Sequence, residues 1–464
     1  MSETTNKSSG LLLLIAAGMA QFIVCADWWA AAIALPPMAK DLGVEAVDLQ
    51  WVLTGYVMTF CAILGVAGPL GDRYGRKLIL QIGICVFAVV SLWVGLSQSV
   101  SMVIVSRIFL GIGGGLLFPL ATAVVSEASS PGKLPRNLSI LLGIVIMGAA
   151  GGPVIGGALT QVLDWRWIFF ANIPVCAVAF VMVQLFAKES SDPDSKGRLD
   201  YVGIFLLLIG IGAISVGIDR IPHWPIDAWL PLGAFGLLTL LFLGWFELHI
   251  KSPLIDLRLL GNRQFIGFAV GGMAGNVAWC IIVFASTLLL QQVFKFSVLS
   301  TGLFFLFISG STAFASFIGA RMERWLGAHF LVGVALVFQG IGLFIMFIND
   351  STFWLALALM VAGIGCAWSW SMSQAGAILT ISKERVGMAS GSIMTLVILA
   401  GNTAIVIVAT IMDVSQRAND GHYAPGITMA YLIGTLATAV GLVVFLAILG
   451  KPMTQKKQVE KNAS

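Results

Sequence analysis

The stretch Gly-Pro-Leu-Gly-Asp-Arg-Tyr-Gly-Arg-Lys occupies residues 68–77, between two long apolar segments. Its glycines allow two helix ends to approach each other and to turn tightly. An aspartate among cations can pair with a neighbouring helix end in one conformation and release it in another. A cationic loop after a membrane span can also act only as a topology anchor. A degenerate second copy of the spacing occurs at Gly319, Glu323 and Arg324. This repetition favours a hinge that changes partners between conformations over a simple topology anchor.

The composition indicates a polytopic membrane protein. Of the 464 residues 58% are hydrophobic and 10% are charged, and the mean hydropathy is +0.97. A soluble globular chain has about 25% charged residues, and no soluble fold has enough interior to cover so much apolar surface. The partner implied is therefore the lipid bilayer and not nucleic acid. The six cysteines all fall in apolar segments, where they fit small core residues rather than disulfides or metal ligands.

Polar breaks divide the chain into fourteen predicted membrane-spanning helices of about 18 to 27 residues each. Such lengths cross a hydrocarbon core of about 30 Å with some tilt. The first span contains an acid and is too long for the apolar core of a signal peptide, so we expect the mature protein to keep it. The predicted spans are 11–36, 49–70, 78–97, 101–126, 138–163, 167–187, 201–218, 229–247, 264–290, 299–320, 328–348, 353–379, 388–411 and 426–449.

The positive charges test this count independently. Most of the 26 Lys and Arg residues fall in alternate segments, on the side of the N-terminus. Because cytoplasmic loops carry an excess of Lys and Arg, this pattern predicts that both termini are cytoplasmic. The loop at 68–77 then lies on the cytoplasmic side, and we expect it to latch against the start of span thirteen, near Gly387.

An internal repeat predicts two six-helix halves. Besides the two copies of the loop, Gly-Ile-Gly occurs at 111–113 in span four and at 363–365 in span twelve. Paired halves with a substrate site between them are a known plan for transporters. The predicted domains are an N-terminal six-helix bundle at 1–187, a linker with two extra transmembrane helices at 188–263, a C-terminal six-helix bundle at 264–450 and a cytoplasmic tail at 451–464.

Five further segments, in order along the chain, resemble motifs of the 14-helix drug/proton antiporter family of the major facilitator superfamily. They are residues 27–36, 107–113, 148–157, 165–174 and 246–256, and the loop at 68–77 resembles the loop motif of the superfamily. The resemblance implies an all-α polytopic membrane protein with the major facilitator fold, in which two inserted helices separate two six-helix halves. Departures from the motifs at Trp28, Trp29 and Leu110 affect the expected substrate more than the mechanism.

The candidate proton-coupling residues are the two charges that lie inside spans. Of the 22 acids only Asp27 lies deep in a span, where a carboxylate costs roughly 2.5 to 3.5 kcal/mol and therefore predicts a polar cavity. Burial favours the protonated form of a carboxyl group, so Asp27 could exchange a proton for a cationic substrate. Arg107 is the only cation inside a span, and the resemblance implies a role in proton exchange. The alternatives are structural: a fixed partner such as Gln21 or Arg107 holds Asp27, and Arg107 anchors helix packing.

Two motifs have a backbone rationale. Within 148–157 the glycines stand at helical spacing and predict a flat strip for close helix packing, while the proline predicts a kink. The resemblance implies that this antiporter motif seals the centre of the molecule against leak; close packing alone is the alternative. The residues of the antiporter motif are Gly148, Gly152, Pro153, Gly156 and Gly157. The residues of the predicted cytoplasmic gate are Gly68, Asp72, Arg73, Gly75 and Arg76.

Aromatic side chains inside the spans predict a substrate pocket. Aromatic faces bind flat hydrophobic cations by stacking and by cation–π contacts, and polar side chains accompany them on the same or neighbouring helices. Each tryptophan could instead be a core residue or face lipid. The predicted substrate-binding residues are Trp28, Trp29, Asn276, Trp279, Trp368, Trp370, Gln374 and Asn402.

The resemblance and the placement of charge together predict proton-coupled efflux of hydrophobic or cationic drugs from the cytoplasm by alternating access. Neither a phosphate-binding loop nor an H-E-x-x-H motif occurs in the sequence, so we expect no enzyme activity, no metal and no cofactor, with the proton gradient as driving force. One alternative is a dedicated proton-coupled exporter of a single neutral or anionic metabolite or natural product. Another is a membrane sensor or scaffold that transports nothing. We expect a monomer in a bacterial inner membrane.

Overall fold

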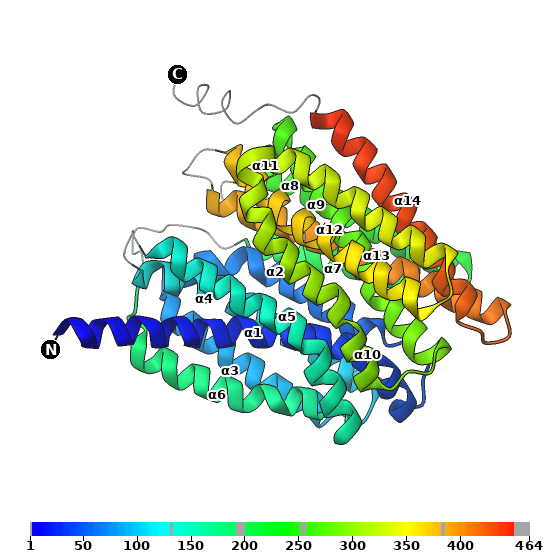
Figure 1. The fold of residues 1–464 in the computed structure, drawn as a ribbon, viewed down its shortest axis with the longest axis horizontal. Coiled ribbons are helices and arrows are strands. Elements are labelled where there is room, and N and C mark those ends of the chain that lie inside the picture. The colour runs from blue at the N-terminus through cyan, green and yellow to red at the C-terminus, as the bar shows by residue number, and fades with distance from the viewer. Residues whose placement is uncertain are drawn as a thin grey trace. The chain divides into compact units, whose positions relative to one another are not determined.

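The computed structural model describes residues 2–129, 133–191, 200–250, 253, 257–381 and 386–449. Within these ranges fourteen helical segments are long and apolar enough to cross a membrane, which confirms the predicted number (Figure 1). All regular secondary structure in the described ranges is helical. The predicted tail at 451–464 lies outside the described residues, as do most of the polar linker and part of the motif at 246–256.

The chain folds into two compact units, Met1–Leu254 with Leu290–Leu303, and Ile255–Leu289 with Phe304–Ser464. The helices of the first unit are α1 (Ser2–Leu42), α2 (Gln50–Tyr74), α3 (Arg76–Gly95), α4 (Val100–Ala128), α5 (Leu134–Val162), α6 (Trp167–Phe186), α7 (Tyr201–Asp219), α8 (Ile226–His249), the π-helix η2 (Leu289–Val293) and α10 (Val298–Phe304), the last two crossing its boundary by one residue. Those of the second unit are the 3-10 helix η1 (Leu257–Gly261), α9 (Arg263–Leu288), α11 (Leu306–Ile348), α12 (Thr352–Leu379), α13 (Val386–Ala418) and α14 (Ala424–Leu449).

The two inserted helices, α7 and α8, belong to the first unit. They pack closely through glycines, since a Cβ atom at Gly236 would lie 2.7 Å from the carbonyl oxygen of Gly210. A polar contact joins α7 to α2, where the Gln50 amide donates to Oδ1 of Asp219 at 2.5 Å. The inserted pair is therefore packed on the first bundle.

The tenth predicted span begins in α10 and continues into α11, which also contains the eleventh. Gly327 is the residue where this helix kinks, with φ of 79° and ψ of 154°, a conformation that glycine adopts without steric cost. The sequence predicts a loop over 321–327, but this segment stays helical up to the kink. Its Arg, Met, Glu and Leu residues are all good helix formers, so only the glycine interrupts the helix.

The glycine strip of the antiporter motif lies against α1. A Cβ atom at Gly152 would lie 2.8 Å from the carbonyl oxygen of Ala26, and one at Gly156 would lie 2.7 Å from Cα of Ala30. Both the glycines of α5 and their partners in α1 repeat every four residues, so the two helices meet along matching faces. Gly157 faces another way, because a Cβ there would lie 2.8 Å from the carbonyl oxygen of Val298.

Replacing Gly152 by valine should lower the thermal unfolding temperature of the detergent-purified protein. The added methyl groups would meet the backbone of α1, and overpacking of this kind costs about 1–3 kcal/mol. Gly151→Val is the matched control, because the nearest atom to a Cβ there is Cδ1 of Ile155 at 3.6 Å. Equal unfolding temperatures for the two variants would contradict the close packing of α1 on α5.

Candidate functional site

Two buried charges of the first unit, on different membrane-spanning helices, form an ion pair. Arg107, in α4, donates through Nη1 to Oδ2 of Asp27, in α1. Asp27 is 1% exposed and Arg107 is 0% exposed. The sequence could not decide whether these residues, 80 positions apart, approach each other; the structure brings them together.

The second oxygen of Asp27 also has a donor. Nδ2 of Asn172, in α6, donates to Oδ1 of Asp27 at 3.0 Å and lies 3.3 Å from Oγ of Ser91, in α3. A carboxamide nitrogen carries two hydrogens, so Asn172 can serve both acceptors. Gln21, one of the two partners considered for Asp27, instead donates to the carbonyl oxygen of Phe118 at 2.5 Å. The carboxylate is therefore held by α4 and α6.

The guanidinium of Arg107 has further partners from α2 and α6. Its Nε donates to the carbonyl oxygen of Val52 at 2.9 Å. Its Cζ lies 4.4 Å from the ring centre of Tyr56 and 5.5 Å from that of Phe169, and both ring faces attract a cation. Nη2 of Arg107 and the hydroxyl of Tyr56 have no hydrogen-bond partner among the described residues. Contacts with four partners thus offset the cost of burying this charge.

Glycines of α4 let the neighbouring helices reach Arg107. A Cβ atom at Gly114 would lie 2.6 Å from the hydroxyl oxygen of Tyr56, and one at Gly113 would lie 2.8 Å from the backbone nitrogen of Phe87, in α3. One turn after Arg107, at Gly111, a Cβ would meet the carbonyl oxygen of Tyr56. The motif at 107–113 therefore places a buried cation next to small residues that allow α2 and α3 to pack closely on α4.

The chemistry of this cluster is dominated by charge compensation. A buried ion pair is tolerated when both partners keep good geometry and additional hydrogen bonds, and the loss of one partner leaves an uncompensated charge. Proton uptake by Asp27 would remove one of the two charges. Arg107 would then retain the carbonyl of Val52 and the faces of Tyr56 and Phe169. The guanidinium of Arg107 therefore has polar and aromatic partners that do not depend on Asp27.

At the predicted gate, the charges pair within the first unit. Arg76 donates through Nε to Oδ1 of Asp72 at 2.9 Å and forms an ion pair with Glu127, at the end of α4, at 3.0 Å. Arg73 is exposed and lies over the ring of Tyr74, 5.2 Å from its centre. A Cβ at Gly68 would find no atom within 4 Å. The predicted partner near Gly387 lies outside the residues whose side chains the structure describes.

The turn between α2 and α3 is closed by residues that follow α6. The carboxylate of Glu189 accepts from the backbone nitrogens of Lys77 at 3.1 Å and Leu78 at 3.2 Å. An acidic group there satisfies free N–H groups and opposes the positive end of the α3 dipole. Gly75 has φ of 109°, and a Cβ on it would lie 2.5 Å from Oε1 of Glu189. Glycine is therefore required at position 75 for two reasons: the positive φ and the close approach of Glu189.

Among the predicted substrate-binding residues of the first unit, Trp29 is a packing residue. It is 4% exposed, and its Cβ would lie 2.8 Å from a Cβ placed on Gly152. Trp28 is partly exposed and meets Trp29 edge to face, with ring centres 5.6 Å apart. Of these two rings, Trp28 is the one left available for a ligand.

In the second unit, hydrogen bonds fix two of the six predicted substrate-binding residues. Trp368 Nε1 donates to the carbonyl oxygen of Ala315 at 2.8 Å, and Asn276 Nδ2 donates to that of Val397 at 2.9 Å. Trp370 packs on the hydrophobic core, while Trp279 and Gln374 are partly buried. The remaining residue, Asn402, is 1% exposed and has no hydrogen-bond partner for either side-chain atom among the described residues.

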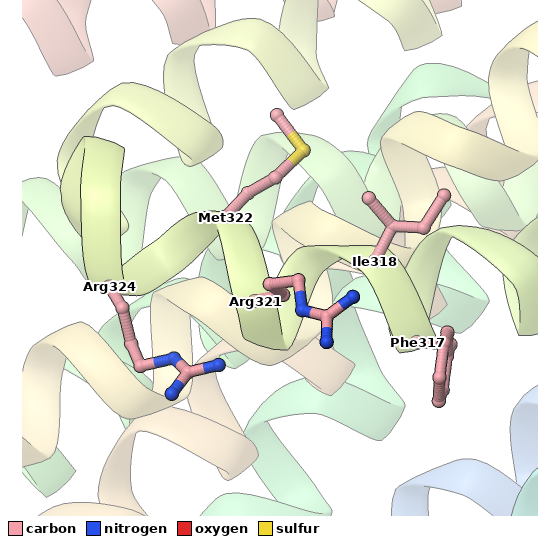
Figure 2. Close-up of a pocket in the computed structure, with 5 residues that line it drawn as sticks. All are labelled: Phe317, Ile318, Arg321, Met322 and Arg324. Atoms are coloured by element: carbon pink, nitrogen blue, oxygen red, sulfur yellow. The ribbon is translucent and has the colours of Figure 1, made fainter.

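The second unit also has a cavity of about 460 Å³ on α11. Figure 2 shows that its lining includes two arginines of the degenerate repeat region. The lining residues are Phe317, Ile318, Arg321, Met322 and Arg324. None of the eight predicted substrate-binding residues lines this cavity, so it is separate from the predicted aromatic pocket.

A sequence profile described as Major Facilitator Superfamily matches residues 17–338. The chain belongs to this family. Solved structures of transporters have the same fold: a mutant of the nucleoside transporter NupG aligns with a TM-score of 0.68 at 12% identity, over 94% of this chain and 100% of that one. A mutant of the peptide transporter POT, in complex with sulfate, gives the same TM-score at 14% identity, over 94% of each chain.

Related superfamily members are export and multidrug proteins. The cephamycin export protein CmcT of Amycolatopsis lactamdurans is 30% identical over 70% of this chain and 68% of its own length. The multidrug transporter protein MdtP of Bacillus subtilis is 24% identical over 89% of this chain and 77% of its own. The tetracenomycin C resistance and export protein of Streptomyces glaucescens is 30% identical over 64% of this chain. The match spans 56% of that relative's length.

Several residues that contact the predicted site residues were not themselves predicted from the sequence. Asn172 lies inside the quoted motif at 165–174 but has no charge that would single it out in a span. Tyr56 resembles any other core aromatic in the sequence. Glu127 stands in the last turn of α4 and Glu189 follows α6, and acids are ordinary at such helix ends. Only the tertiary contacts identify these residues, because each meets a partner from a distant part of the chain.

Removing Arg107 alone should destabilise the protein by about 3–5 kcal/mol, because Asp27 would become a buried charge without a counter-ion. The double variant Asp27→Leu/Arg107→Met should recover most of this loss, since it removes both charges. Denaturant unfolding of the purified protein and a double-mutant cycle would measure the coupling. Strictly additive effects of Asp27→Leu and Arg107→Met would contradict a stabilising ion pair.

Replacing Glu189 by alanine should lower the unfolding temperature by the loss of a helix cap, about 1 kcal/mol. Glu189→Gln should have an intermediate effect, because the amide oxygen still accepts a hydrogen bond but carries no charge to oppose the helix dipole. Thermal unfolding of the three proteins in one detergent would check this order. A stability of Glu189→Ala equal to that of the wild type would exclude the cap.

Proposed function

We propose that this protein exports hydrophobic or cationic drug-like molecules from the cytoplasm in exchange for protons. The carrying observation is the Asp27–Arg107 pair, since it places a protonatable carboxylate, 1% exposed, among four membrane-spanning helices of a superfamily transporter. Relatives named as a multidrug transporter protein and a cephamycin export protein support export as the direction of transport. An intramembrane acid is by default a functional site because burial makes it costly.

The proposed coupling step is a change in the protonation of Asp27. A substrate arriving from the cytoplasm displaces the proton, and the carboxylate pairs with Arg107. After access to the site changes to the outside, a proton returns to Asp27, neutralises it and releases the substrate. Asn172 is a positioning residue in this cycle, because its amide donates to one carboxylate oxygen of Asp27 at 3.0 Å.

We further propose a location and a set of partners. The protein lies in a bacterial inner membrane with both termini in the cytoplasm, acts as a monomer, and binds its substrate and protons. It is not an enzyme and uses no cofactor. The positive-inside pattern of Lys and Arg supports the orientation.

A dedicated exporter of one natural product is the second candidate. The second unit favours it, since α9 and α12 contain no Asp or Glu and their polar residues are uncharged apart from Arg263 at the start of α9. A pocket that selects a cation needs an acid or aromatic faces, and Trp368 is already committed to helix packing. Two relatives carry the names of single products, tetracenomycin C and cephamycin.

In proteoliposomes with a trapped pH dye, addition of ethidium should release protons from the wild type and not from Asp27→Asn, because the amide cannot bind the coupling proton. Exchange of labelled substrate across the membrane should persist in Asp27→Asn, since it needs no net proton movement. Asp164→Asn is the control, because this acid lies in the short connection between α5 and α6, where it accepts from the backbone nitrogen of Arg166 and pairs with its guanidinium.

Proton release that survives Asp27→Asn would place the coupling elsewhere in the chain. A wild type that ignores ethidium and tetraphenylphosphonium but moves a neutral natural product would favour the dedicated exporter. If Asp27→Asn loses both substrate exchange and proton release, Asp27 serves either folding or substrate binding. A thermal unfolding measurement of the same preparation would distinguish a folding role from a binding role.

A further inference from the structure

Helix α13 carries two buried polar side chains that the fold does not satisfy. Asn402 is 1% exposed, and neither its Nδ2 nor its Oδ1 has a hydrogen-bond partner among the described residues. Thr395 is 0% exposed, and its hydroxyl also has no partner in the described part of the chain. The large majority of buried side-chain polar atoms in proteins are hydrogen bonded, so both exceptions need an explanation.

The hydroxyl of Thr395 is unusual within its own helix. A threonine in a membrane helix commonly donates to the carbonyl four residues before it. Thr403 does so to Leu399 at 3.0 Å, and Thr410 does so to Val406 at 2.9 Å. Thr395 has this carbonyl within reach along the helix and makes no such bond. Its hydroxyl is therefore available to a group outside the helix.

Thr395 and Asn402 stand on one face of α13. They are seven residues apart, which is two helical turns and about 10 Å along the axis. The face that meets α9 is a different one, because Val397 accepts from Asn276 there and Gly401 fits beside Cys280. The unsatisfied pair is thus not part of the packing between α13 and α9.

The chemistry of the pair selects an uncharged partner. An amide offers donors and an acceptor, and a hydroxyl offers one donor and two acceptor lone pairs. Neither carries a fixed charge. Alcohols, ketones and amides complement these groups, whereas a lipophilic cation without hydrogen-bonding atoms does not.

We propose that Thr395 and Asn402 form a hydrogen-bonding site for the hydroxyl, carbonyl or amide groups of the exported molecule. This inference rests on the proposed export function and names the chemical class that the second unit recognises. A ligand that bridges both residues has polar groups about 10 Å apart, the scale of two helical turns. The site holds a neutral portion of the substrate, independently of any charge that Asp27 exchanges.

Transport in proteoliposomes tests the site with two probes. Chloramphenicol is neutral and carries hydroxyl and amide groups, and tetraphenylphosphonium is a cation without hydrogen-bonding atoms. Asn402→Leu and Thr395→Val should each raise the KM for chloramphenicol about tenfold, the loss expected for roughly 1.4 kcal/mol of hydrogen bonding, and leave tetraphenylphosphonium unchanged. Thr403→Val is the matched control and should change neither, because its hydroxyl is satisfied by its own helix.

Thermal unfolding without substrate supplies a second readout. Asn402→Leu should unfold at the wild-type temperature or above, because it removes a buried amide that lacks partners. A marked fall would show that Asn402 has structural partners and would overturn the proposal. Thr395→Val replaces the hydroxyl by a methyl group of similar size. The transport test can therefore still be made with this variant if Asn402→Leu does not fold.

The outcomes separate this inference from the proposed function. A wild type that moves neither probe refutes the proposed export of drug-like molecules, and the site falls with it. A wild type that moves tetraphenylphosphonium but not chloramphenicol, or equal KM changes in Thr395→Val and Thr403→Val, overturns the neutral hydrogen-bonding site and leaves proton-coupled export intact.

Discussion

The first unit is organised around two opposite charges buried in a chain with few charges. A carboxylate or a guanidinium alone in such an interior would be strongly unfavourable, so Asp27 and Arg107 must meet and must keep additional partners. Their partners come from four other places: Asn172, the carbonyl of Val52, and the rings of Tyr56 and Phe169. The positions of α1, α2, α4 and α6 are all constrained by this one requirement.

Close helix packing allows Asp27 and Arg107 to reach each other and their other partners. Inside a membrane the hydrophobic effect does not draw apolar helices together, so van der Waals packing at small residues has to do so. The glycines of α4 admit α2 and α3 next to Arg107, and the glycines of α5 admit α1 along the length that carries Asp27. A side chain at either strip would move the charges apart and would therefore affect chemistry as well as stability.

The two units differ in how they use polar groups. The first buries an ion pair and surrounds it with donors and ring faces, while the buried polar residues of α9 and α12 in the second are uncharged. Charge suits the exchange of a proton, and neutral hydrogen-bonding groups suit the recognition of a molecule by shape and by its polar atoms. The repeat in the sequence is therefore one of architecture and not of chemistry.

The sequence determined the features that depend on local composition, namely the fourteen apolar helices, the superfamily motifs and the rarity of acids that singled out Asp27. Only the tertiary structure decided which distant residues meet. One sequence does not say which helices are neighbours, so it left Gln21 and Arg107 as alternative partners for Asp27 and assigned Trp368 to a pocket although it packs helices together. The role of Asn172 was invisible for the same reason. Long-range contacts depend on the sum of many packing choices, and no local pattern encodes that sum.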